Sequence, residues 1–143
     1  MSACTFFGHR DCPNEIRPRL YDVLIDLIEH HSVDTFYVGN QGGFDATVYK
    51  ALKELKQMYP HIQYAIVLAY LPTEATASQY DPSETLFPEG MEKAPKRFAI
   101  DRRNRWMLQR AKYVVTYVTH SWGGAAKYAE IAEKQNRIVN NLS

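Results

Sequence analysis

Residues 113–126 of this chain have the sequence Tyr-Val-Val-Thr-Tyr-Val-Thr-His-Ser-Trp-Gly-Gly-Ala-Ala. Aromatic and β-branched residues fill positions 113–119, which predicts a buried strand, and the pair Gly123-Gly124 then begins a stretch of helix-forming residues. Paired glycines let a ligand approach the backbone, and the free N–H groups of a first helical turn favour an anion. The segment therefore predicts a strand-to-helix junction that can receive phosphate or carboxylate, with His120 and Ser121 beside the glycines.

Two further glycine turns follow the first two apolar runs. Gly8-His9-Arg10 comes after a strand predicted at 4–7, and Gly42-Gly43, with Asp45 just beyond, comes after one predicted at 35–38. Open parallel sheets bind ligands beyond the carboxyl ends of their strands, where the strand order reverses. In the common order 3-2-1-4-5, the three turns would meet at one crevice and form an anion site. The alternative is that each glycine only permits a tight turn.

Strand-like and helix-like segments alternate along the whole chain. Short apolar runs predict strands, and apolar residues at three- and four-residue spacing predict helices. The predicted strands are 4–7, 35–38, 63–69, 113–119 and 137–139, and the predicted helices are 16–28, 44–59, 100–111 and 125–135. This alternation predicts a single α/β domain over residues 1–143, with a doubly wound parallel sheet of about five strands in the order 3-2-1-4-5.

Composition indicates one compact domain without a membrane span. The 143 residues are 45% hydrophobic and 23% charged, and the formal net charge is only +1. No apolar stretch approaches the roughly 20 residues needed to cross a bilayer, and the first residues lack a secretory signal pattern, so a cytoplasmic protein is expected. Cys4 and Cys12 form neither a CxxC motif nor part of a Cys/His cluster, so no disulfide, metal site or cofactor is predicted.

Residues 70–96 interrupt the alternation. They hold four of the seven prolines and show no sustained periodicity. Loops longer than about 12 to 15 residues in compact domains are commonly lids or binding loops. The segment is therefore interpreted as a lid-like loop with room for a short helix, the alternative being an insertion without a role.

The predicted helix at 100–111 carries polar groups on its apolar side. At 100° per residue, Asn104 falls between Ile100 and Leu108, and Arg103 lies at the edge of the same stripe. A buried amide or guanidinium needs a partner because it loses its hydration. A ligand could be that partner for Arg103, and so could a core carboxylate; alternatively, the side chain could reach solvent from the edge of the stripe.

Eight lysine and arginine residues fall within positions 93–112, which suggests a nucleic-acid surface as one hypothesis. Their helical phases scatter them around the axis, and the chain shows no RRM, KH or helix-turn-helix signature and no basic excess. A local positive field for a small anion fits this pattern better, so a nucleic-acid partner is not favoured.

Glu130 lies seven residues, about two helical turns, after Gly123 and therefore projects on nearly the same face of its helix. Ala126 lies between them, and its small side chain leaves a column through which the carboxylate could reach a ligand at the glycine turn. The alternative is a solvated glutamate.

Five segments in the same order resemble the SLOG superfamily. They are Phe7-Gly8-His9-Arg10, Gly42-Gly43-Phe44-Asp45, Pro88-Glu89-Gly90-Met91-Glu92, Arg103-Asn104-Arg105-Trp106-Met107 and Trp122-Gly123-Gly124-Ala125. This superfamily of Rossmann-like domains includes the lonely-guy phosphoribohydrolases and DprA-type proteins, and the chain most resembles a branch of small bacterial and phage proteins of unknown function related to YpsA. The resemblance covers nearly the whole chain and implies binding of a nucleotide or nucleotide-derived ligand at the glycine turns.

The resemblance also implies roles for two charged residues. In the lonely-guy motif Pro-Gly-Gly-x-Gly-Thr-x-x-Glu, Gly123-Gly124 and Glu130 match, whereas other residues replace the proline, the third glycine and the threonine. Arg103, four residues before Met107, fits the spacing of the enzymes' arginine, although Asn104 stands where lysine is usual. Arg103 and Glu130 are therefore the candidate catalytic residues, and the phosphate cradle is altered.

Three hypotheses follow. In the first, the chain is a sensor or ligand-binding module in which N–H groups at Gly123-Gly124 hold phosphate, Arg103 neutralises it, and the base or ribose lies near residues 8–10 and 42–45. In the second, it is a phosphoribohydrolase-like N-glycosidic hydrolase of nucleoside monophosphates that uses Glu130 and Arg103. In the third, it is an interaction module for nucleic acid or protein. A nucleotide-like small molecule is the expected partner, and the lonely-guy relatives imply a homodimer.

Overall fold

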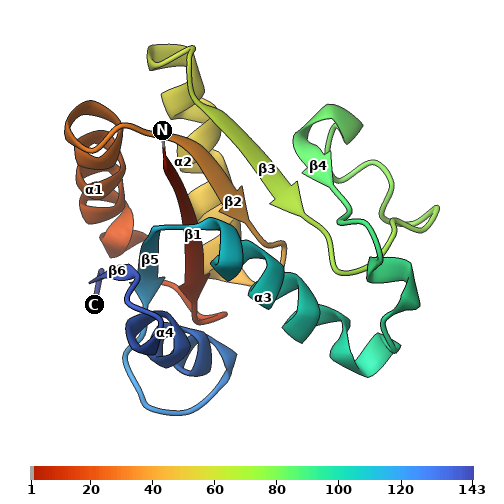
Figure 1. Cartoon of the computed structure of the whole chain (residues 1–143). Coiled ribbons are helices and arrows are strands. Elements are labelled where there is room, and N and C mark those ends of the chain that lie inside the picture. Colours follow the sequence, from red (N-terminus) through yellow and green to blue (C-terminus); the bar gives the residue numbers. More distant parts are fainter. Residues whose placement is uncertain (1) are drawn as a thin grey trace.

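The computed structural model describes residues 2–143, which form one parallel sheet with helices on both of its faces (Figure 1). The strands are β1 (Ser2–Gly8), β2 (Val33–Val38), β3 (Gln63–Val67), β4 (Thr85–Leu86), β5 (Tyr113–Tyr117) and β6 (Ile138–Asn141). The α-helices are α1 (Arg17–His30), α2 (Gly43–Met58), α3 (Ala99–Arg110) and α4 (Gly124–Lys134). Short 3-10 turns are η1 (Asn14–Ile16), η2 (Pro82–Glu84), η3 (Met91–Lys93) and η4 (Lys96–Phe98).

Six strands form the sheet in the order β4-β3-β2-β1-β5-β6, and every neighbouring pair is parallel. The chain places β2 and β3 on one side of β1 and then β5 and β6 on the other, so the order reverses between β1 and β5. Apart from β4, the strands follow the predicted order 3-2-1-4-5. The predicted number of strands was one too low, because β4 contributes only two residues, which pair with Ile66 and Val67 at the sheet edge.

Each face of the sheet is covered by one pair of helices. Cys4 and Phe6 of β1 pack in a large core with apolar residues of α1 and α2. Phe7, which points to the other face because strand side chains alternate, packs with Met107 of α3 and Tyr128 of α4. Figure 1 shows α3 in front of the sheet and α2 behind it. This three-layer arrangement confirms the predicted doubly wound α/β class.

Glycine geometry fixes two of the turns at the carboxyl edge of the sheet. Gly42, with φ 94°, directly precedes α2, and Gly123, with φ 92°, directly precedes α4. Glycine adopts these angles without the steric cost that other residues incur. Both helices therefore begin at the edge where the predicted ligand turns lie.

Residues 70–96 contain β4 with the turns η2 and η3; residues 70–79 are exposed, and the part around β4 packs along the β3 edge of the sheet. Glu84 accepts hydrogen bonds from the hydroxyl groups of Tyr49 and Tyr64, which tie the segment to α2 and β3. Met91 is 3% exposed and belongs to a small apolar cluster. These contacts hold the segment against the edge of the sheet.

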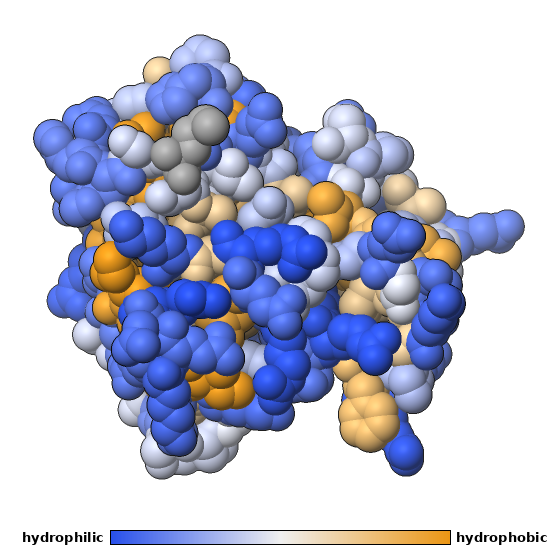
Figure 2. Space-filling view, in the orientation of Figure 1, coloured by the Kyte–Doolittle hydropathy of each residue, from blue (hydrophilic) through white to orange (hydrophobic). Residues whose placement is uncertain are grey.

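Polar residues are frequent both in the helices and on the surface of the molecule. Within residues 2–143, no helix is both long enough and apolar enough to cross a membrane. Figure 2 shows a largely hydrophilic face in which apolar residues form separate patches. The helix α3 contributes exposed polar side chains that include Arg102, Arg105 and Gln109.

Candidate functional site

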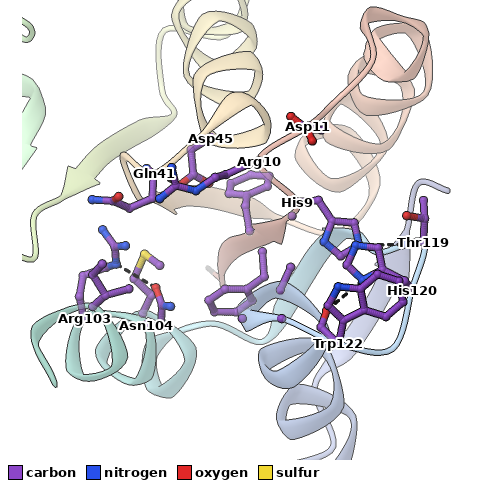
Figure 3. Close-up of a pocket in the computed structure, with 18 residues that line it drawn as sticks. His9, Arg10, Asp11, Gln41, Asp45, Arg103, Asn104, Thr119, His120 and Trp122 are labelled. Carbon is purple, nitrogen blue, oxygen red and sulfur yellow. Dashed lines mark hydrogen bonds between the residues drawn. The ribbon is translucent and has the colours of Figure 1, made fainter. Parts of the chain in front are cut away.

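A cavity of about 620 Å³ opens at the carboxyl edge of the sheet, next to α3 and the start of α4 (Figure 3). The 18 residues that line it are Phe6, Phe7, Gly8, His9, Arg10, Asp11, Gln41, Asp45, Ile100, Arg103, Asn104, Met107, Thr119, His120, Trp122, Gly123, Gly124 and Ala125. They come from the end of β1, from the loops after β1, β2 and β5, and from the helices α2, α3 and α4. The volume falls within the range of small-molecule sites.

The start of α4 presents an open backbone to this cavity. Gly123 is the residue that caps the helix, and no side chain hydrogen-bonds there as a cap. A Cβ placed on Gly123 or Gly124 would have no heavy atom within 4 Å, so the space over the first turn is unobstructed. The first N–H groups of a helix have no partner within it, and the helix dipole is positive at this end. The turn is therefore suited to an anion.

Arg103 projects from α3 with only 2% of its surface exposed. Its Nη1 donates to the Val67 carbonyl at 2.9 Å and to Asn40 Oδ1 at 3.3 Å, and its Nε donates to Asn104 Oδ1 at 2.8 Å. The hydrogen bonds found within residues 2–143 leave Nη2 without a protein acceptor. Burial lowers the pKa of Arg103, and nearby Asp45 partly offsets that effect. The guanidinium is thus held in place inside the protein and does not reach out to solvent.

Asp45 shares a corner of the site with Arg103, and Gly39 lies between them. A Cβ on Gly39 would come within 2.9 Å of Asp45 Oδ2 and 3.0 Å of the guanidinium carbon, so a side chain at position 39 would disturb both groups. Asp45 Oδ2 accepts a hydrogen bond from the Gln41 N–H at 2.9 Å. Burial nevertheless raises the pKa of Asp45 to about 6, against the lowering effects of this hydrogen bond and of Arg103. Near that pH the carboxyl group is half protonated and repels an anion less.

Three aromatic rings are stacked on the opposite side of the cavity from Arg103 (Figure 3). The ring centroids of His9 and His120 are 3.8 Å apart, and those of His120 and Trp122 are 3.7 Å apart. The Thr119 N–H donates to His9 Nε2 at 2.9 Å, and His120 Nδ1 lies 3.0 Å from the Trp122 carbonyl oxygen. Burial, together with the neighbouring His120, lowers the pKa of His9, in agreement with a neutral ring that accepts a hydrogen bond.

The other glycines of the predicted site maintain close packing. A Cβ on Gly8 would lie 2.2 Å from the Phe44 ring, so β1 and α2 could not approach as they do. Gly43 donates its N–H to the Arg10 carbonyl at 2.8 Å, and Gly42 lies against the side chain of Arg10. Gly42 and Gly43 therefore position the loop that carries Arg10, and neither lines the cavity.

The structure brings most of the predicted site residues together. Those that line the cavity are Gly8, His9, Arg10, Asp45, Arg103, Asn104, His120, Gly123 and Gly124. Besides Gly42 and Gly43, Ser121 lies outside the lining and is exposed. None of residues 70–96 lines the cavity, so this structure does not place the expected lid over it.

Glu130 is not brought to the cavity. Its side chain is 65% exposed and pairs with Lys134 at 2.9 Å, one turn further along α4. From the sequence, the carboxylate was expected to reach back over Ala126 to the glycine turn. Seven residues at about 1.5 Å per residue carry the carboxylate on the order of 10 Å along the axis from Gly123. The carboxylates that do line the cavity are those of Asp11 and Asp45.

Several lining residues were absent from the predicted site. Gln41 and Thr119 follow the ends of β2 and β5, so the rule that ligands bind beyond strand ends would have included them. Trp122 lies in the predicted anion-binding loop, directly before Gly123-Gly124, and its position beside the glycine pair could have identified it as a lining residue. Phe6 and Phe7 gave no signal beyond that of core residues, because the same side chains belong to the core and line the cavity.

Comparison with known proteins identifies relatives by structure alone. No protein-family model and no curated protein sequence matches this chain. The X-ray structure of DNA processing protein A (DprA) from Streptococcus pneumoniae is similar with a TM-score of 0.70 and 16% sequence identity, over 99% of this chain and 50% of that one. DprA from Helicobacter pylori, whose structure addresses its single-stranded DNA binding mode, gives a TM-score of 0.67 and 12% identity, over 98% of this chain and 64% of that one.

These comparisons establish a shared fold. The chain spans half the length of one DprA and 64% of the other, at sequence identities of 16% and 12%. Since DprA-type proteins are members of the SLOG superfamily, the similarity confirms the Rossmann-like fold that the sequence resemblance implied. The assignment to the YpsA-related branch stays a prediction.

Proposed function

We propose that this chain binds a nucleotide or nucleotide-derived phosphorylated ligand at the carboxyl edge of its sheet, as a sensor or ligand-binding module. The observation that carries the proposal is the open, uncapped first turn of α4, which lines the same cavity as Arg10 and Arg103. Helix N-termini and arginine guanidinium groups both hold phosphate oxygens through N–H donors. Their presence in one cavity favours a phosphorylated ligand over a neutral one.

The rest of the lining suits the organic part of such a ligand. Phe6, Phe7 and Met107 contribute apolar groups to the lining, whereas Gln41 and Asn104 contribute amide groups. Ligand sites commonly combine apolar walls with a few polar groups that fix orientation. A sugar or base attached to the phosphate would meet both kinds of surface here.

Single-stranded nucleic acid is the second candidate ligand. The Helicobacter pylori DprA, which shares this fold, is described as binding single-stranded DNA. The phosphate chemistry proposed for the α4 turn is the same for a free nucleotide and for a strand. The scattered basic residues at 93–112 did not favour a nucleic-acid partner. The donors proposed to hold phosphate, however, are the cavity residues in the loops and Arg103, so the scatter of the other basic residues does not count against a strand.

The hydrolase alternative depends on a carboxylate that can reach the sugar. Glu130, the residue that the lonely-guy motif implies, lies outside the cavity lining and is paired with Lys134. A general acid or base must come within hydrogen-bond reach of the proton it transfers. We therefore favour binding over hydrolysis, and the test below follows both ligand binding and release of free base.

The test combines thermal shift with release of free base. Purified protein is incubated with nucleoside monophosphates, dinucleotides and a short oligo-dT strand, and both the Tm and free base are followed. We expect a rise in Tm without release of base, and a smaller rise for Arg10→Ala. Arg17→Ala, an exposed arginine on α1 outside the cavity, is the matched control and should respond as the wild type does. Absence of a shift with every compound would refute the proposal, and base release that Glu130→Gln abolishes would establish the hydrolase instead.

A further inference from the structure

The ring stack formed by His9, His120 and Trp122 ends on an indole that is 69% exposed. One face of the indole packs on His120, and among residues 2–143 no other aromatic ring stacks on it. Single exposed apolar residues are common and require no explanation. Trp122 differs because its ring continues an ordered stack and lines the cavity that holds the start of α4.

The stack is held in place from several directions. Thr119 fixes the His9 ring through Nε2, and the Trp122 carbonyl fixes the His120 ring through Nδ1. The start of the same loop is tied to the C-terminal segment, because Asn141 bonds both the N–H and the carbonyl of Val118, each at 3.0 Å. A surface that is ordered before binding loses little conformational entropy when a ligand arrives. The indole is therefore a preorganised flat surface.

We propose that the exposed face of Trp122 is the stacking site for a nucleobase whose phosphate lies at the first turn of α4. The inference rests on the proposed function and adds the position and the chemistry of the base. Trp122 immediately precedes Gly123 and Gly124, so the flat surface and the anion-binding turn are contiguous along the chain. Purine and pyrimidine rings stack on aromatic side chains with little dependence on sequence, because every base has a π-face.

This placement differs from the one that the sequence indicated. The sequence had placed the base or ribose near residues 8–10 and 42–45. Residues 8–10 and Asp45 line the cavity, whereas Gly42 and Gly43 do not. In this proposal the His9 ring supports the stack at its inner end, and Trp122 provides the free face for the base. The shared chemistry is a nucleobase joined to phosphate, and its source is either a mononucleotide or a single-stranded DNA.

The two tryptophans of the chain permit a direct optical test. Trp106 packs edge-on against Tyr37 and beneath the Arg110 guanidinium, away from the cavity lining, so Trp106→Phe leaves Trp122 as the sole indole. Three probes are titrated into this protein: ribose 5-phosphate, AMP and a short oligo-dT strand. We expect AMP to quench the Trp122 emission, whereas ribose 5-phosphate binds without quenching. Quenching by oligo-dT and not by AMP would support the stacking site and identify single-stranded DNA as the source.

Binding by calorimetry to Trp122→Ala and Trp122→Phe completes the test. A lost base stack weakens binding by roughly tenfold, so Trp122→Ala should lower the affinity for AMP by that factor and leave ribose 5-phosphate unchanged. Trp122→Phe keeps an aromatic face and should retain most of the affinity. Equal affinities of AMP and ribose 5-phosphate, unaffected by Trp122→Ala, together with no quenching by oligo-dT, would overturn this inference alone. Absence of binding by all three probes would overturn the proposed function together with it.

Discussion

Replacing Asp45 by asparagine should stabilise the protein in a pH-dependent way. Burial raises the pKa of Asp45 from 3.8 to about 6, so the folded protein holds this proton more tightly than the unfolded chain does. Each pKa unit corresponds to about 1.4 kcal/mol, so the ionised carboxylate costs the folded state about 3 kcal/mol. That cost is absent below pH 3.8, grows as the pH rises, and is complete above pH 6. Asparagine keeps an oxygen that can accept the Gln41 N–H and carries no charge.

The assay is urea unfolding, followed by circular dichroism, at a series of pH values. We expect the free energy of unfolding of Asp45→Asn to exceed that of the wild type by up to about 3 kcal/mol above pH 6, and the difference to vanish toward pH 3.8. Asp22→Asn, on the exposed side of α1, is the control and should show no such trend. A difference that does not shrink with falling pH, or a variant less stable than the wild type above pH 6, would refute the electrostatic reasoning.

Four further variants separate packing from binding. Gly8→Ala should lower the free energy of unfolding, measured in urea, by about 1 to 3 kcal/mol, because its Cβ would overlap the Phe44 ring. Gly124→Ala, whose Cβ would meet open space, should keep full stability and weaken AMP binding. Equal stability of the two variants would contradict this reasoning. Arg103→Met should lose about 1 to 3 kcal/mol of stability as its buried acceptors lose their donor, and calorimetry should also show weaker AMP binding; full retention of both would refute its place in the site. Glu130→Gln should change stability by less than about 0.5 kcal/mol, as expected for an exposed ion pair, and any large fall in AMP affinity by calorimetry would show that Glu130 reaches the ligand.

The arrangement of the sheet could be predicted because its signals are local and repeated. Each long strand carries an apolar run and each helix a regular stripe, so the alternation defines a parallel sheet before any long-range contact is known. The strand β4 has only two residues in a proline-rich segment, and nothing in its own sequence marks it. It exists as a strand because Ile66 and Val67 of β3 lie beside it, which is information held elsewhere in the chain.

In the candidate site, too, local features could be predicted from the sequence and long-range contacts could not. Arg103 was identified from helical phase, since a regular helix converts sequence position directly into direction. Glu130 projects on the expected side of its helix, but it pairs with Lys134, one turn further from the cavity, and does not reach back over the two turns to Gly123. The contact between His9 and His120 joins two loops that are far apart in sequence, and it forms because β1 and β5 are neighbours in the sheet. Strand order indicated that these loops meet, but not that their rings stack.

Asp45 lies close to Arg103, although neither stability nor anion binding favours an ionised carboxylate at this corner. Burial makes a charged guanidinium costly, and Asp45 lies close enough, across Gly39, to favour that charge. A phosphate at the same corner would supply the negative charge itself, and Asp45, with a pKa of about 6, could then take up a proton at little cost. Under the proposed function, a bound phosphate would therefore take over from the Asp45 carboxylate as the counter-charge of Arg103.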